Sequence, residues 1–217
     1  MFYHSIANIN VYDSLALDRF ATQMCANRYL RILGDGQVQL IEDGYTGYVR
    51  SQDFEYLEPV DPKSYNPPKS LTSAQIRECI PDAIAYTKKS MQHPNRYLWG
   101  GTVPPDYDCS GLMQAAFVSM GIWIPRDAYQ QEAFVQAIAL DALEPGDLVF
   151  FGVDKATHVG MYLGEGQYIH SSGQEHGNDG IGIDSLAGGN RVSDWYAQQL
   201  RGAGRVTKCL QPSLAIG

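Results

Sequence analysis

Four cysteines and five histidines are the side chains of this sequence best suited to nucleophilic and acid–base chemistry. Among them, Cys109 has a distinctive setting, the run Asp108-Cys109-Ser110-Gly111. Apolar residues follow it at three- and four-residue steps, which predicts a helix with Asp108 as N-cap and Cys109 in its first turn. Free backbone N–H groups and the positive end of the helix dipole favour a thiolate there. The pattern suits covalent catalysis by Cys109, and a small buried structural cysteine is the alternative that it leaves open.

A cysteine nucleophile needs a base, and histidine is the usual one near neutral pH. His158 opens a predicted strand, and His170 lies in the next strand, across a short turn at 164–166. A hairpin there brings the two imidazoles together, so that one can act as base while the other orients it. Ordinary strand histidines are one alternative, and a zinc site of Cys109, His158, His170 and His176 is another. Their spacing lacks a local ligand pair, so we expect neither a metal nor another cofactor.

The elements that must position these residues lie in the second part of the chain. Thr72 with Gln75 predicts a capping box that opens a helix, which Pro81 should kink or restart and Pro94 should stop. A third helix is predicted to start at 125–127. After residue 146, short apolar runs between glycine-rich turns predict strands at 147–151, 158–163, 167–171 and 181–184, then a short helix and a last strand. Helices followed by strands indicate an α+β fold.

The first 60 residues predict β-structure instead. Asp35-Gly36 and Asp43-Gly44 are strong hairpin signals between short apolar runs. Several short strands with tight turns suggest a small barrel, because closure removes exposed edges. Four prolines within 59–70 predict a semi-rigid linker. The expected organisation is therefore a barrel over 1–60, a linker over 61–71 and a second domain over 72–210.

Composition limits the partners and the location. The formal net charge is −8, from 16 basic and 24 acidic residues, and no basic run is present, which argues against nucleic acid and anionic membranes as partners. No apolar stretch reaches the roughly 18–20 residues of a membrane span. The first residues lack the pattern of a secretory signal, and the cysteines form neither a CxxC pair nor a disulfide framework. We therefore expect a cytoplasmic protein.

Five motifs carry a family resemblance. They are Tyr-Leu-Trp-Gly-Gly at 97–101, Asp-Cys-Ser-Gly-Leu at 108–112, Leu-Glu-Pro-Gly-Asp-Leu-Val-Phe-Phe at 143–151, His-Val-Gly-Met-Tyr-Leu-Gly at 158–164 and Tyr-Ile-His-Ser-Ser at 168–172. In this order and spacing, residues 72–207 resemble the NlpC-type papain-like cysteine peptidases. The N-terminal part resembles a bacterial SH3-like barrel. The resemblance implies an α+β papain-like domain with a central antiparallel sheet, preceded by that barrel.

The resemblance also implies roles at the reacting centre. Cys109 is the implied nucleophile, His158 the general base and acid, and His170 the residue that orients His158. The tetrahedral intermediate carries an oxyanion, which needs donors where its charge develops. The backbone N–H of Cys109 and the hydroxyl of Tyr97, which the resemblance places against the nucleophile, are the expected donors.

Substrate contacts follow from the same resemblance. Asp108 is expected to pair with the ammonium of a terminal L-alanine, and Ser110 to donate to the α-carboxylate of D-glutamate. The family commonly has a serine where this chain has Ala128, so Arg126 or backbone amides are expected to serve that carboxylate instead.

The barrel is expected to pack on the catalytic domain in cis and to wall off one end of the groove. Tyr48 and one acid, Glu58 or else Asp53 or Glu55, are the residues expected in that wall. A wall of this kind admits only a peptide with a free amino terminus.

The combination of the two parts resembles the γ-D-glutamyl-L-diamino acid endopeptidases. It implies cleavage of the bond between D-glutamate and diaminopimelate in murein peptides with a free N-terminal L-alanine, during cell-wall recycling. Because the triad does not encode the substrate, a related amidase or acyltransferase is an alternative. A non-catalytic wall-binding protein is a second, and a secreted lytic enzyme is a third if a signal has been removed upstream of Met1.

Overall fold

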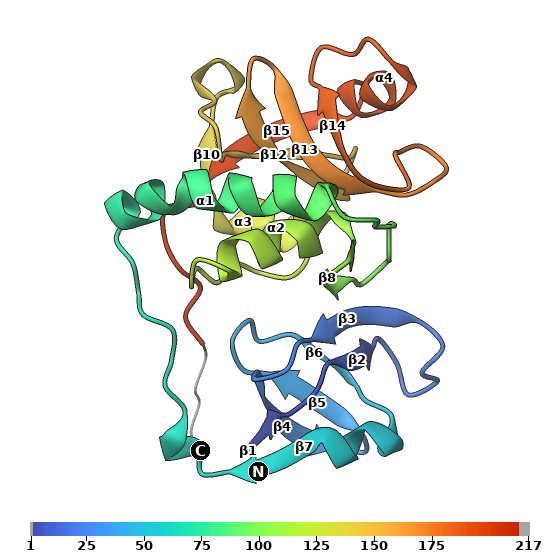
Figure 1. Ribbon diagram of the computed structural model, residues 1–217, viewed down its shortest axis with the longest axis vertical. Helices are drawn as coiled ribbons and strands as arrows, with labels where there is room; N and C mark the ends of the chain where they lie inside the picture. The colour runs from blue at the N-terminus through green and yellow to red at the C-terminus, as the bar shows by residue number, and fades with distance from the viewer. Residues whose placement is uncertain (1, 213–217) are drawn as a thin grey trace.

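The computed structural model describes residues 2–212, which form two β-rich parts stacked along the long axis of the molecule (Figure 1). The N-terminal part is a seven-stranded sheet with the strand order β3-β2-β6-β5-β4-β1-β7, and every pairing is antiparallel. We call it the N-terminal sheet. Its strands are β1 Phe2–Ser5, β2 Ile9–Tyr12, β3 Phe20–Met24, β4 Tyr29–Gly34, β5 Gln37–Leu40, β6 Thr46–Tyr48 and β7 Leu57–Val60.

The predicted hairpins shape this sheet. At the turn between β4 and β5, Asp35 and Gly36 have φ values of +47° and +76°, the left-handed pair that suits a two-residue hairpin. The short η1 helix, Ser51–Tyr56, leads into β7. The predicted β-structure is confirmed and is consistent with an SH3-like domain, whereas the boundaries at 60, 71 and 210 stay a prediction.

Residues 61–72 contain only the one-turn η2 helix, Pro62–Ser64, before α1 runs from Ser73 to Met91. The predicted capping box is present, because Thr72 and Gln75 bond each other's backbone N–H groups. Of the two alternatives predicted at Pro81, the restart is wrong, since α1 continues through it, and the kink stays a prediction. One missing N–H removes a single hydrogen bond, while Ile76 and Ala83 bury the apolar face of this helix in the core.

The second part contains a six-stranded antiparallel sheet with the order β10-β15-β11-β12-β13-β14, which confirms the α+β class. The exposed edge strand β10 was not predicted; it follows α3 directly and pairs with β15. The remaining elements are β8 Thr102–Val103, β9 Asp106–Tyr107, α2 Cys109–Val118, α3 Ala128–Phe134, β10 Gln136–Ile138, η3 Leu140–Ala142, β11 Leu148–Phe151, β12 His158–Gly164, β13 Gln167–Ser172, β14 Gly180–Ser185, α4 Arg191–Ala197 and β15 Leu200–Arg205.

Two apolar layers cover this sheet. Leu148 and Phe150 of β11 belong to the core that α1 and α2 share, whereas Val149 and Phe151 pack in a second cluster with residues of α4. Both faces of the strand are therefore buried, which explains why it reads as an unbroken apolar run. Of the helices in residues 2–212, none combines the length and the apolar character needed to cross a bilayer.

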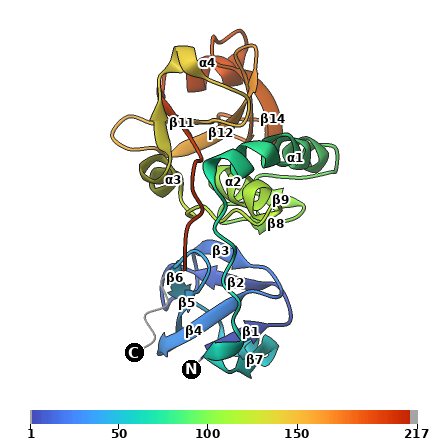
Figure 2. The same cartoon turned by 90° about the vertical axis from the view of Figure 1, so that its left-hand side faces the viewer.

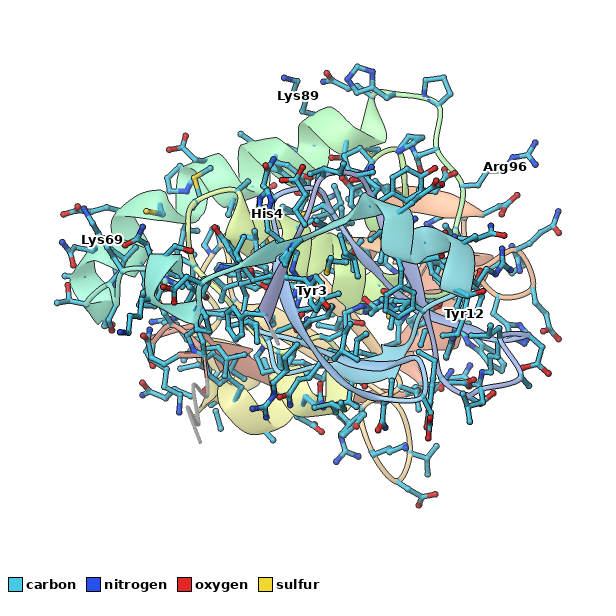
Figure 3. All side chains as sticks on the ribbon, turned by 90° about the horizontal axis from the view of Figure 1, so that it is seen from below. Tyr3, His4, Tyr12, Lys69, Lys89 and Arg96 are labelled. Carbon is cyan, nitrogen blue, oxygen red and sulfur yellow. The ribbon has the colours of Figure 1, made fainter. Side chains whose placement is uncertain are left out.

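In both views of the ribbon, α2 lies on the side of its sheet that faces the N-terminal sheet, and β3 is the N-terminal strand beside β8 (Figures 1 and 2). Thr102 of β8 donates its hydroxyl to the carbonyl of Gln23 in β3 over 2.9 Å. Figure 3, which views the molecule from below, shows the basic side chains Lys89 and Arg96 projecting at its periphery. The start of the cysteine helix thus lies close to the N-terminal sheet.

Candidate active site

Cys109 is the first residue of α2, as predicted, and Asp108 is its N-cap. One carboxylate oxygen of Asp108 accepts the backbone N–H of Gly111 over 2.6 Å. The approach loop passes so close to this turn that a side chain on Gly111 would collide with the carbonyl of Gly101. The Cys109 side chain is buried but lines a cavity of about 340 Å³, through which a ligand can reach it.

The protonation state of Cys109 differs from the prediction. Burial, followed by the nearby carboxylate of Asp108, raises the pKa of the thiol to about 12. The N–H groups of Val159 and Ser110 and the charge of Arg126 act in the opposite direction without prevailing. The helix start therefore does not by itself bring the pKa of the Cys109 thiol below its ordinary value.

His158 and His170 lie side by side, as the hairpin predicts. His158 Nε2 is 2.7 Å from His170 Nδ1, and the two rings are nearly perpendicular, at 89°. The register of β12 against β13 continues to place Gly160 opposite His170, where a Cβ would approach the His170 Cβ within 3.2 Å. The missing side chain leaves room for the two imidazoles to meet diagonally across the strands.

Asp184 follows His158 and His170 as the third member of a hydrogen-bonded row, and it was not identified from the sequence. His170 Nε2 lies 3.0 Å from its Oδ2, and the carboxylate also accepts hydrogen bonds from Asn178 and Ser193. Burial alone would raise the pKa of Asp184, but these hydrogen bonds hold it well below the usual range. The sequence did hold a signal for Asp184, which is a polar residue among the apolar residues of β14. The pairing of β13 with β14 puts it on the same face of the sheet as His170.

The row of acceptors fixes the tautomers. An ionised carboxylate can only accept, so the proton of His170 lies on Nε2 and its Nδ1 is an acceptor. His158 must then donate from Nε2, which leaves the lone pair on its Nδ1. Burial, and next the neighbouring His170, hold the pKa of His158 well below 6.5. His158 is therefore a neutral imidazole, the form that a general base requires.

The sulfur and His158 are neighbours through the backbone. The N–H of Val159, the residue after His158, points at the Cys109 sulfur. Within residues 2–212 the thiol forms no hydrogen bond to either imidazole, an arrangement common before substrate binds. Tyr196, which was also missed, stacks on the His158 ring at 4.3 Å and 26° and so holds its plane.

Comparison with known proteins identifies this arrangement. The model of the NlpC/P60 family matches residues 94–200. These residues are an NlpC/P60 domain. The family is one of cell-wall peptidases, which are hydrolases acting on peptides derived from peptidoglycan.

Individual relatives match a part of the chain. Over 111 residues the chain is 38% identical to a probable endopeptidase p60 of Listeria seeligeri, a match that covers 51% of this chain and 19% of that protein. Over 79 residues it is 42% identical to a γ-D-glutamyl-L-lysine dipeptidyl-peptidase of Bacillus subtilis, covering 35% of this chain and 27% of that protein. The chain thus spans about a fifth to a quarter of the length of the curated relatives that it matches.

A solved structure shares the fold. The peptidoglycan hydrolase RipB of Mycobacterium tuberculosis resembles this chain with a TM-score of 0.51 at 24% identity, covering 63% of this chain and 69% of that one.

Tyr97 and Ser110 line the same cavity as Cys109 in the NlpC/P60 domain. Burial, followed by the proximity of Cys109, raises the pKa of the Tyr97 phenol, so that it stays a donor at any physiological pH. Ser110 Oγ accepts from Arg126 over 2.9 Å and faces Asp108 at 3.3 Å. Their predicted roles, toward the oxyanion and the substrate carboxylate, stay predictions.

Arg126 is not placed as predicted. Its side chain is 1% exposed, and its guanidinium forms a two-point ion pair with Asp108, with contacts of 2.6 and 3.1 Å. It does not line the cavity, so it is not the carboxylate-binding residue expected there. Asp108 accepts five hydrogen bonds in all, from Gly100, Gly111, Ser110 and twice from Arg126, which leaves no lone pair for a substrate ammonium.

The residues that the N-terminal sheet contributes to the cavity are also different. Tyr48 and Glu58 lie in β6 and β7 and do not line it, and neither do Asp53 and Glu55. The lining residues are instead on the β2–β3 connection, on β3 and on the β5–β6 turn: Asp13, Arg19, Phe20, Ala21 and Tyr45. The order of the strands decides this outcome, because β3 and not β7 is the edge strand that contacts β8 of the second part.

His176, the fourth residue considered for a zinc site, stacks on the Trp195 ring at 3.8 Å and faces Glu175. Among the residues that the structure describes, no cluster of three or more His, Cys, Asp or Glu side chains is arranged to hold a metal ion.

Proposed function

We propose that the protein is a cysteine endopeptidase that cleaves the bond between D-glutamate and an L-diamino acid, diaminopimelate in the first instance, in murein peptides with a free N-terminal L-alanine. The observation that carries the proposal is the row Asp184, His170, His158 behind Cys109, inside an NlpC/P60 domain. This row supplies a neutral base to a thiol that cannot ionise unaided.

The chemistry follows from that row. The Cys109 sulfur bonds to the γ-carbonyl carbon of D-glutamate while its proton moves to His158 Nδ1. The imidazolium is stabilised by His170 and Asp184, and it then protonates the amine of the diamino acid as the C–N bond breaks. Water, deprotonated by the same nitrogen, hydrolyses the thioester and releases L-Ala-γ-D-Glu.

The charges around the cavity support a small zwitterionic ligand. Asp13 and Asp127 supply negative charge, and Arg19 and Lys155 supply positive charge. A peptide that begins L-Ala-γ-D-Glu carries one ammonium and one α-carboxylate near the scissile bond. Lys155 lines the cavity together with Ala128, and its ammonium lies 5.1 Å from the centre of the Tyr129 ring. Lys155 is therefore the proposed partner of the carboxylate in place of the missing serine.

The N-terminal sheet supports the requirement for a free amino terminus. Phe20, Ala21 and Tyr45 line one side of the cavity, so the chain of a bound peptide has little room to continue there. Asp13 also lines the cavity with an exposed carboxylate, which pairs with Arg19 at 3.4 Å, and it is the proposed partner of the ammonium. A relative named as a dipeptidyl-peptidase for γ-D-glutamyl-L-lysine bonds supports both the bond and the length of the released product.

A role in recycling such peptides in the cytoplasm is part of the proposal. The four cysteines, Cys25, Cys79, Cys109 and Cys209, are all unpaired, which agrees with a reducing compartment.

The test is incubation of the protein with L-Ala-γ-D-Glu-diaminopimelate, its N-acetylated form and the corresponding L-lysine peptide, with products identified by mass spectrometry. We expect the dipeptide from the free peptide, no cleavage of the acetylated one, and no product with Cys109→Ala. Equal cleavage of the acetylated peptide would contradict the free-terminus requirement. Turnover by Cys109→Ala would contradict the mechanism.

A further inference from the structure

We propose that Thr22, a residue of strand β3 in the N-terminal sheet, is a positioning residue for the nucleophile. Its hydroxyl fixes the guanidinium of Arg126, and Arg126 fixes the Asp108 carboxylate that caps the Cys109 helix. The proposal rests on the proposed function only in taking Cys109 as the nucleophile.

The first link is the contact between the two parts of the chain. Arg126 Nε donates to Thr22 Oγ1 over 2.7 Å. Thr22 is fully buried and Arg126 is 1% exposed. Water therefore has no access to take over this hydrogen bond, and removing the hydroxyl leaves a buried N–H of a charged group unpaired.

The second link is the fork between Arg126 and Asp108. Two guanidinium nitrogens hold the two carboxylate oxygens, and a third contact reaches Ser110 Oγ over 2.9 Å. The guanidinium is planar, so the direction of its Nε–H fixes the orientation of the whole fork. Among the hydrogen-bond partners of the Arg126 guanidinium within residues 2–212, Thr22 is the one that comes from the N-terminal sheet.

The third link joins Asp108 to both sides of the nucleophile. One oxygen accepts the N–H of Gly100, in the approach loop, over 2.8 Å. The other accepts the N–H of Gly111, in the first turn of α2, over 2.6 Å. A rotation of the carboxylate thus moves the loop and the helix start that enclose Cys109.

Other contacts dock β3 independently of Thr22. The Gln23 side-chain oxygen accepts the N–H groups of Thr102 and Val103, each over 3.1 Å, and the Thr102 hydroxyl bonds the Gln23 carbonyl. A Cβ built on Gly100 would lie only 3.0 Å from the backbone of Ala21, so strand and loop are in close contact. Removal of the Thr22 hydroxyl should therefore leave the two parts together and disturb only the fork.

These contacts define a set of matched variants. Thr22→Val removes the hydroxyl and keeps the shape, and Thr22→Ser keeps the hydroxyl. Thr102→Val removes a different hydrogen bond between the two parts, and Thr87→Val removes the hydroxyl of another fully buried threonine, which bonds within α1. Thr22→Ala replaces Thr22→Val if the valine variant does not fold.

The readout is the rate at which iodoacetamide alkylates Cys109, followed by mass spectrometry of the Cys109 peptide across a range of pH. We expect Thr22→Val to slow alkylation about 10-fold at each pH, because the fork no longer holds the positive charge and the helix start in place beside the thiol. With the murein peptide, kcat should fall by about 10- to 100-fold while KM changes little.

Thr22→Ser, which keeps the hydroxyl, should match the wild-type protein in alkylation rate, kcat and KM. Thr102→Val and Thr87→Val should match it as well. A folded Thr22→Val protein that is alkylated at the wild-type rate overturns the proposal, and so does equal slowing by Thr102→Val. Failure of the wild-type protein to cleave any murein peptide counts against the proposed function alone, because alkylation of Cys109 needs no substrate.

Discussion

Replacement of Asp184 by asparagine is the most direct test of the histidine row. The substitution keeps the shape of the side chain and one acceptor oxygen for His170, but removes the negative charge behind the two rings. That charge matters when the Cys109 proton moves to His158, because an imidazolium then forms in a buried site. Asp184→Asn should therefore slow the step in which the thiol attacks.

The structure sets the size of the effect. The Asp184 oxygen is 3.0 Å from His170 Nε2, and His170 Nδ1 is 2.7 Å from His158 Nε2. Across the intervening ring, the two charges are roughly 7 Å apart, and at an effective dielectric constant of about 20 their attraction is about 2 kcal/mol. We therefore expect kcat/KM to fall by roughly 30-fold.

The assay is the pH profile of kcat/KM on the murein peptide, with a thermal melt to show that the variant is folded. Asp194→Asn is the matched control. Asp194 is an exposed carboxylate in α4, which accepts the N–H of Gly189 and has no contact with the histidines. A folded Asp184→Asn enzyme within about twofold of wild type would refute the electrostatic role of Asp184.

Two further results are expected. Lys155→Met should raise KM about fivefold for a peptide with the free D-glutamate α-carboxylate, because one exposed charge contact is lost. KM for the corresponding α-carboxamide should not change. The control is Lys208→Met, which removes a comparable lysine that lies over the Phe134 ring and should change neither KM. The melting temperature should fall as the pH drops below about 6.5. Burial lowers the pKa of both His158 and His170 in the folded protein, so the unfolded chain takes up protons at a higher pH than the folded one. The stabilisation present above pH 6.5 is therefore lost as the pH falls. His158→Gln should flatten this dependence in a melt series, and an unchanged slope would show that the two rings do not cause it.

Several features could be read from the sequence because they depend on near neighbours in the chain. The Asp108 cap and the Thr72–Gln75 capping box each join residues three positions apart, and backbone geometry brings such residues together in any helix. His158 and His170 meet because a short turn folds one strand onto the next. These local rules do not need the rest of the fold.

Other features required contacts between distant segments. Arg126 has a charge suited to binding a substrate carboxylate, but it is buried and bonded to Thr22, 104 positions away, and to Asp108, the N-cap of α2. The acid and the tyrosine expected in the wall were Glu58 and Tyr48, but Asp13 and Tyr45 line the cavity instead, since the order of strands puts β3 beside it.

The sequence by itself determined the helix that begins at Cys109, the pairing of His158 with His170 and the α+β order of elements, because each is set by spacing along a few residues. Only the tertiary structure decided that burial raises the pKa of Cys109, that Asp184 contacts His170, and that Thr22 of β3 bonds the arginine that holds the Asp108 cap. Burial and the approach of residues far apart in the chain produce these properties, and neither can be computed from local spacing.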